Sequence, residues 1–188
     1  NPNSKILTIT KVCSLWAGFG TIYEVTCTTK EEPLIFKAIQ LPNSCTSIGD
    51  LRKKQSYVCE ANFYKNGIAQ RLNQIGCVVP EPMYSTQDSP ILIAMTKLNG
   101  VSCGNLDFGH AVACMKWFAN LHSEFWGKAR ADEAVRKYGI QQQGTYWYLD
   151  TRPDEFNSMP NTGWEGRLKK AATDIDSYLK TDDCFPTV

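Results

Sequence analysis

The chain has 188 residues, of which 43% are hydrophobic and 21% are charged, the proportions of an ordinary globular protein. This length is enough for one domain or for a tight pair of lobes. The net charge of +1, with no dominant basic face, argues against an electrostatic nucleic-acid binder. Because no apolar run approaches the roughly 20 residues that cross a bilayer, we expect no transmembrane segment.

Three strands are predicted in the first 42 residues. Residues 6–15 (ILTITKVCSL) and 20–29 (GTIYEVTCTT) alternate in hydrophobicity and are rich in β-branched side chains. The sequence WAGFG joins them, and its Gly18 and Gly20 permit a tight loop. A polar turn, TTKEEP, leads into the third strand within residues 31–43 (EEPLIFKAIQLPN). We expect these strands to be antiparallel neighbours.

One helix is predicted to follow, over residues 48–72. Asp50 is its expected N-cap, and Gly67 either bends the helix or divides it in two. Residues 77–86 (CVVPEPMYST) and 89–98 (SPILIAMTKL) then read as two further strands, with prolines at their boundaries. The expected fold is therefore α+β: a five-stranded antiparallel sheet with one inserted helix, forming a lobe over residues 1–98.

Residues 99–188 are predicted to be helical and to begin a second lobe. One helix is expected from Leu106 to Trp126, with an apolar stripe, and another from Trp164 to Leu179. The segment 141–160 (QQQGTYWYLDTRPDEFNSMP) is too aromatic for a plain linker. It is either a loop anchored to the core by its aromatic side chains or a patch that faces a partner.

Cysteine and histidine usage predicts no metal site. The eight cysteines form no CxxC pair and no cluster with histidine, and His110 and His122 are too far apart around a helix to share one ion. The sequence has no N-glycosylation sequon, which favours a reducing compartment. We expect a cytoplasmic protein or, because the chain starts with Asn rather than Met, an organellar protein after removal of a leader.

Lys37 lies in the middle of the apolar run LIFKAIQL. Removing an ammonium group from water costs several kcal/mol unless an anion compensates it. Glu60, in the sequence SYVCEANFY of the following helix, is the best candidate for that anion. A glycine-bearing loop, a strand lysine and a helix glutamate, in this order, are the parts of a kinase nucleotide lobe.

Five stretches of the chain resemble the choline-kinase-like and aminoglycoside-phosphotransferase-like superfamily, in particular its ecdysteroid-kinase-like branch. They are LIFKAIQLP, SYVCEANFY, GCVVPEPMY, ILIAMTKLNG and FANLHSEFWG, and they occur in the family's order. The resemblance implies a protein-kinase-like fold, with a five-stranded N-lobe and the first helices of an incomplete C-lobe. It also implies ATP and Mg²⁺ as cofactors and a small-molecule hydroxyl as the phosphate acceptor.

The resemblance also implies roles for individual residues. Lys37 would hold the α and β phosphates of ATP, and Glu60 would pair with it. The loop that covers the phosphates would contain Gly18, Phe19 and Gly20. The hinge along the adenine edge would be formed by Met95, Thr96, Lys97 and Leu98. His122 would be a packing residue of the C-lobe helix.

The sequence departs from the family pattern at the catalytic loop. Family members carry an HGD-type loop, a following Asn and an acidic metal ligand, but no HxD occurs in these residues. Without a base and magnesium ligands we expect no turnover from residues 1–188 alone. The resemblance therefore implies a phosphotransferase if the chain continues beyond Val188. The alternative is a non-catalytic, kinase-derived scaffold or accessory subunit, whose partners are the protein subunits of a larger assembly.

Overall fold

The computed structural model describes residues 4–15, 18–41, 47–100, 104–142 and 149–181. The chain divides into two compact units, Asn1–Gln142 and Gln143–Val188. The first unit contains the sheet and the helices that pack on it, and the second is helical in its described part. The lobe boundary predicted after residue 98 falls inside the first unit and stays a prediction.

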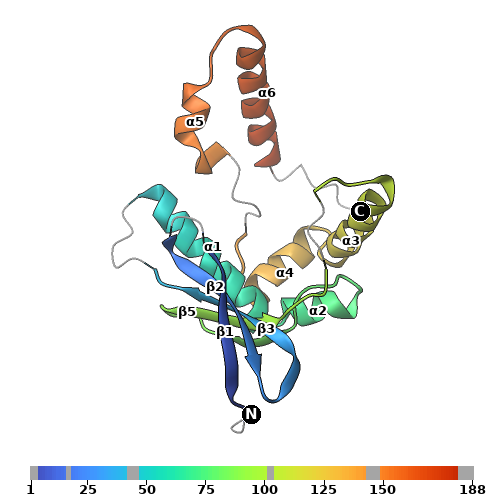
Figure 1. The fold of residues 1–188 in the computed structure, drawn as a ribbon. Coiled ribbons are helices and arrows are strands. Elements are labelled where there is room, and N and C mark those ends of the chain that lie inside the picture. The colour runs from blue at the N-terminus through green and yellow to red at the C-terminus, as the bar shows by residue number, and fades with distance from the viewer. Residues whose placement is uncertain (1–3, 16–17, 42–46, 101–103, 143–148, 182–188) are drawn as a thin grey trace. The chain divides into compact units, whose positions relative to one another are not determined.

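Five strands form one antiparallel, open sheet in the order β1-β2-β3-β5-β4. Figure 1 shows the sheet with the helices that follow it. Their bounds are β1 Ile6–Ser14, β2 Gly20–Cys27, β3 Lys30–Ile39, β4 Pro82–Ser85 and β5 Ile91–Thr96. The predicted α+β class, with five antiparallel strands followed by helices, is therefore confirmed. The fourth strand is shorter than its predicted range of 77–86, and it begins at Pro82, where a proline at the strand end removes no ladder hydrogen bond.

The segment inserted between β3 and β4 contains two helices, α1 (Ile48–Lys65) and α2 (Ile68–Gln74). They are separate because Gly67 adopts a left-handed conformation with φ of 99°. The N-cap of α1 is Ser47 and not Asp50, since the Ser47 side chain accepts a hydrogen bond from the Asp50 backbone N–H. Of the two alternatives expected at Gly67, the structure shows the division into two helices, so the inserted segment is not one helix, and the expected cap at Asp50 was wrong.

Helix α1 packs against β4 and β5 and covers one face of the sheet (Figure 1). The core between them contains six buried side chains: Ile39, Leu41, Ala61, Ile91, Ile93 and Met95. Four of them, Ile39 of β3 and Ile91, Ile93 and Met95 of β5, point to the same face because side chains alternate along a strand. This layer fixes α1, and with it Glu60, over the centre of β3.

A second core joins α2 to two later helices of the same unit, α3 (Phe108–Glu124) and α4 (Lys128–Tyr138). Its buried residues are Ile68, Leu72, Cys77, Ala134 and Tyr138, with Trp117, Leu121 and Phe125 of the α3 region packed against them. Helix α3 lies within its predicted range of 106–126. Helix α4 was not predicted from the sequence.

The second unit contains a short 3-10 helix at Leu149–Thr151, α5 (Pro153–Ser158) and α6 (Gly163–Leu179). Helix α6 matches the predicted range of 164–179 to within one residue. Lys169 of α6 donates hydrogen bonds to the backbone oxygens of Asn157 and Met159, which ties α6 to the end of α5. The aromatic residues 146–148 of the predicted patch lie outside the described residues.

Candidate functional site

Lys37 and Glu60 meet, as the sequence predicted. The Lys37 Nζ atom lies 2.8 Å from Oε1 and 2.6 Å from Oε2 of Glu60, so both carboxylate oxygens accept hydrogen bonds from one ammonium group. The side chains are 14% and 32% exposed, respectively. The ammonium is therefore taken largely out of bulk water and compensated by a single carboxylate.

The register of the sheet explains why Lys37 points toward α1. Its β3 neighbours on the same face are Ile35 and Ile39, and both belong to the core under α1. Its partners on the neighbouring strands are Ile22 and Ile93. Lys37 is thus surrounded by apolar side chains on its own strand and on both neighbours.

Tyr57 and Tyr64 flank Glu60 on α1, one turn before it and one turn after it. The ring of Tyr57 lies 5.5 Å from the Lys37 Nζ atom, within the range of a cation–π contact. Burial raises the pKa of both tyrosines, and the Glu60 carboxylate raises it further. The phenols therefore stay neutral beside the ion pair well above physiological pH.

The loop between β1 and β2 is held at both ends by backbone hydrogen bonds. The Leu15 N–H donates to the Gly20 oxygen at 2.8 Å, and the Gln40 N–H donates to the Phe19 oxygen at 2.7 Å. Gly18 has φ of 73°, a conformation that favours glycine. Residues 16 and 17 of this loop lie outside the described residues.

Phe19 brings this loop to the helix that carries Glu60. Its ring contacts the ring of Tyr57 edge to face, with 6.5 Å between centroids. The Lys53 Nζ atom lies 5.1 Å from the centroid of the Phe19 ring. Of the three residues predicted for the phosphate-covering loop, Phe19 thus contacts Tyr57, which in turn contacts Lys37. The contact between Phe19 and Tyr57 was not foreseen from the sequence.

The four residues predicted to form the hinge lie at the end of β5 and directly after it: Met95, Thr96, Lys97 and Leu98. Met95 is buried in the core under α1, next to Ile35. Thr96 exchanges hydrogen bonds with the backbone of Glu81, through its own N–H and its hydroxyl group. The backbone N–H of Thr96 therefore already has a protein partner.

Lys97 forms an ion pair that the sequence analysis missed. Its Nζ atom lies 2.7 Å from Oε2 of Glu24 on β2. Glu24 is the cross-strand partner of Ile35, so it lies on the face of the sheet that carries Lys37. The two partners are 73 positions apart in the sequence, so no local pattern predicts their contact.

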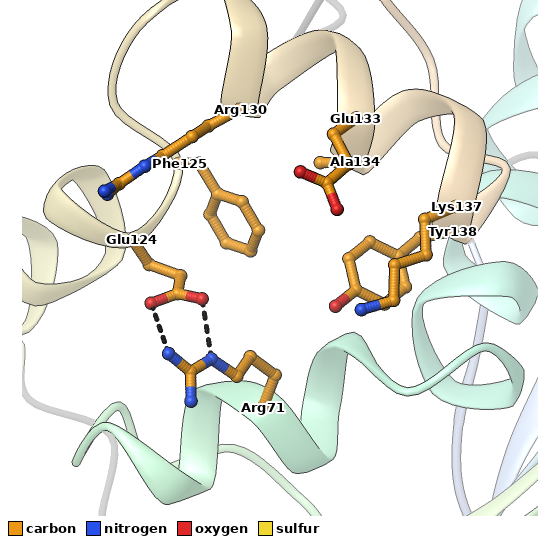
Figure 2. A pocket seen from close by; sticks show the side chains of 8 residues that line it. All are labelled: Arg71, Glu124, Phe125, Arg130, Glu133, Ala134, Lys137 and Tyr138. Atoms are coloured by element: carbon orange, nitrogen blue, oxygen red, sulfur yellow. Dashed lines mark hydrogen bonds and ion pairs between the residues drawn. The ribbon is translucent and has the colours of Figure 1, made fainter.

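One pocket, of about 370 Å³, lies between α2, the end of α3 and α4. Figure 2 shows Arg71 reaching across it to Glu124, and their two hydrogen bonds measure 2.6 and 2.8 Å. These bonds favour the charged carboxylate and lower the pKa of Glu124. Arg130 and Lys137 also line the pocket, but Glu133 beside them offsets part of their charge, so no strong anion site results.

A second pocket, of about 230 Å³, is lined by the predicted loop residues Gly18, Phe19 and Gly20 and, among others, by Thr21 and Ala38. Thr21 and Ala38 are cross-strand partners, and Ala38 directly follows Lys37, so these two residues lie on the opposite face of the sheet from Lys37. Neither of these two pockets includes Lys37 or Glu60.

Among the described residues, no three His, Cys, Asp or Glu side chains gather in a way that could hold a metal ion. The described helices also include none that combines the length and the apolar character needed to cross a membrane. The cysteines that are described, which are Cys13, Cys27, Cys59, Cys77 and Cys114, are free thiols.

Comparisons with models of protein families, with curated proteins and with solved structures find no match to this chain.

Proposed function

We propose that the chain forms the nucleotide-binding part of an ATP-dependent phosphotransferase that resembles the choline, aminoglycoside and ecdysteroid kinases. The acceptor is a small-molecule hydroxyl, and the fold is protein-kinase-like. One observation carries the proposal. Lys37, in the apolar strand β3, donates hydrogen bonds to both carboxylate oxygens of Glu60 on α1. Exposed ion pairs on a protein surface contribute little to stability. The Lys37–Glu60 pair is instead half-buried at the centre of the sheet, and this placement favours a functional role over a purely stabilising one.

The residues present fit the phosphates of a nucleotide. Lys37 supplies a cation whose direction is fixed by Glu60 and by the ring of Tyr57. The loop with Gly18 and Gly20 leads into β2, the strand next to β3. The Gly18 N–H already donates to the Leu15 oxygen, so other backbone N–H groups of the loop would meet the phosphate oxygens. Lys53 on α1 places a second ammonium group against the ring of Phe19 in that loop.

In this proposal the chain contributes position and charge. Phosphoryl transfer depends on the alignment of the phosphates and on the neutralisation of their charge, and bound Mg²⁺ supplies part of that charge. Lys37 orients the α and β phosphates, and Glu60 prevents the ammonium group from turning away. Residues 1–188 contain no HxD sequence, so the proposal assigns nucleotide binding, and not the general base, to these residues.

A non-catalytic accessory subunit is the second candidate. The observation that favours it is the outward face of α3, where Phe108 is 86% exposed and Met115 is 67% exposed. Exposed apolar side chains along a helix are typical of a surface that another protein chain covers. In this case the partners are the protein subunits of a larger assembly.

Titration with Mg²⁺ and a non-hydrolysable ATP analogue separates the two candidates. We expect the unmodified chain to bind the analogue and Lys37→Met to weaken binding at least tenfold, because a charge-assisted contact to phosphate is lost. Isothermal calorimetry measures both affinities. Lys54→Met is the matched control, because Lys54 is an exposed lysine on α1. We expect this variant to bind the analogue within about twofold of the affinity of the unmodified chain.

Absence of binding by the unmodified chain contradicts the nucleotide proposal and favours the accessory subunit. Equal loss of affinity in Lys37→Met and Lys54→Met also contradicts it, because such binding depends on general positive charge and not on the ion pair.

A further inference from the structure

Helix α6 has one half-buried face and, beside it, one exposed apolar face. Glu165, Lys169 and Asp176 are half-buried, and Lys169 is hydrogen-bonded to the end of α5. Roughly a quarter of a turn away around the helix, a second stripe is apolar and exposed: Trp164, Leu168, Ala171 and Ile175. Its large members are 51–63% exposed. The contacts with α5 therefore leave this stripe uncovered.

The spacing of the exposed stripe is that of a coiled-coil seam. With Leu168 and Ile175 at position a of a heptad, Trp164 and Ala171 fall at position d. Two helices with such a seam pack by inserting the side chains of one between those of the other. An exposed apolar seam is thus typical of a helix that a second helix covers.

Two opposite charges flank the seam. Arg167 and Asp174 both fall at position g of the heptad, on the side of the seam away from α5. Arg167 has no ion-pair partner among the described residues. Asp174 has only a contact of 3.7 Å with Lys170, and that pair is fully open to solvent screening because its side chains are 66% and 81% exposed. Both charges are therefore available to a second helix.

We propose that α6 is a dimerisation helix, which packs antiparallel against α6 of a second copy of this chain. In this arrangement, Trp164 faces Ile175 of the partner subunit, and Leu168 faces Ala171 of the partner subunit. Each large side chain thus meets a smaller one. A two-fold axis relates the two helices, so every contact occurs twice.

The charges beside the seam select this arrangement. Arg167 lies between the layers of Trp164 and Leu168, and the residue that faces it at position g is Asp174 of the partner subunit. A shift by one heptad would instead place the two Asp174 side chains against each other. In a parallel pair, Arg167 would lie beside Ala172, which carries no charge. Only the antiparallel register with two Arg–Asp pairs satisfies both charges, and a second copy supplies them.

The dimer does not depend on the proposed function, because α6 belongs to the second unit and the Lys37–Glu60 pair to the first. Sedimentation equilibrium over a concentration series measures the mass of the chain and the dissociation constant of the dimer. We expect the mass to rise with concentration toward twice the 21.1 kDa of one chain.

Leu168→Glu should abolish this rise, because it places a charge inside the seam. Thr173→Glu is the matched control. Thr173 is an exposed residue on the side of α6 opposite the seam, so the same new charge should leave the dimer unchanged. Circular dichroism checks that both variants keep their helix content.

Charge reversal tests the register, and it does not threaten folding because both side chains are exposed. Arg167→Asp and Asp174→Arg each bring like charges together twice, so we expect each to raise the dissociation constant about tenfold. The double variant restores two opposite pairs and should bring the dissociation constant back to within about threefold of the unmodified chain.

A chain that remains monomeric at every concentration overturns the proposal, and the exposed face of α6 then belongs to packing within one chain or to a different protein. A dimer that survives Leu168→Glu also overturns it, because another surface then holds the two copies together. If the two charge reversals add in the double variant instead of cancelling, the antiparallel pairing of Arg167 with Asp174 is wrong.

Discussion

Gly20→Ala is expected to destabilise the first unit by about 2–4 kcal/mol, because the new methyl group has no space. A Cβ atom at this position would lie 2.1 Å from the backbone oxygen of Ala38 and 3.0 Å from the Ile39 Cα atom. Both obstacles are backbone atoms of β3, so the two strands must move apart. Urea denaturation, followed by circular dichroism, gives the change in the free energy of unfolding.

Two other glycines provide matched controls for this substitution. Gly18 has open space around it but a positive φ of 73°, so Gly18→Ala should cost about 1–2 kcal/mol through backbone strain alone. Gly100 has open space and no positive φ, so Gly100→Ala should be close to neutral. If Gly20→Ala is no more destabilising than Gly18→Ala, the close approach of β2 and β3 is not as described.

Asn62→Ala is expected to destabilise the first unit by about 2–3 kcal/mol, because it leaves polar partners without hydrogen bonds. Asn62 is 7% exposed and joins three elements. Its side-chain N–H donates to the Gly139 carbonyl at 2.6 Å, and its side-chain oxygen accepts a hydrogen bond from Gln87. The side chain thus fixes α1, two residues after Glu60, to the end of α4 and to the turn between β4 and β5.

Asn120→Ala is the control, since Asn120 is an exposed asparagine within helix α3. Alanine is the better helix former, so we expect that variant to be neutral or slightly more stable. Thermal unfolding compares the two variants under the same conditions. Equal melting temperatures for Asn62→Ala and Asn120→Ala would show that the buried hydrogen bonds contribute nothing to the attachment of α1.

The sequence predicted the sheet and the ion pair because both have local signals. An apolar strand with one lysine needs a nearby anion, and the following helix offered Glu60 between apolar neighbours. Glycines and prolines marked the ends of most strands. The role of these residues in nucleotide binding stays a prediction.

Other features were missed because their signals are weak or distant in sequence. Helix α4 has few apolar residues, although its alanines and the glycines on both sides, Gly127 and Gly139, are typical of a helix with defined ends. Ser47 was overlooked as the cap of α1 in favour of Asp50, three residues later. The pairs Lys97–Glu24 and Phe19–Tyr57 depend on how the strands and α1 pack, which no sequence spacing reveals.

A double-mutant cycle on the affinity for the ATP analogue tests most directly whether Lys37 and Glu60 act together on a nucleotide. If Glu60 acts only by orienting Lys37, then Glu60→Gln and Lys37→Met each weaken binding, and the double variant binds no more weakly than Lys37→Met alone. Losses that simply add, or an unchanged affinity in Glu60→Gln, would contradict the account.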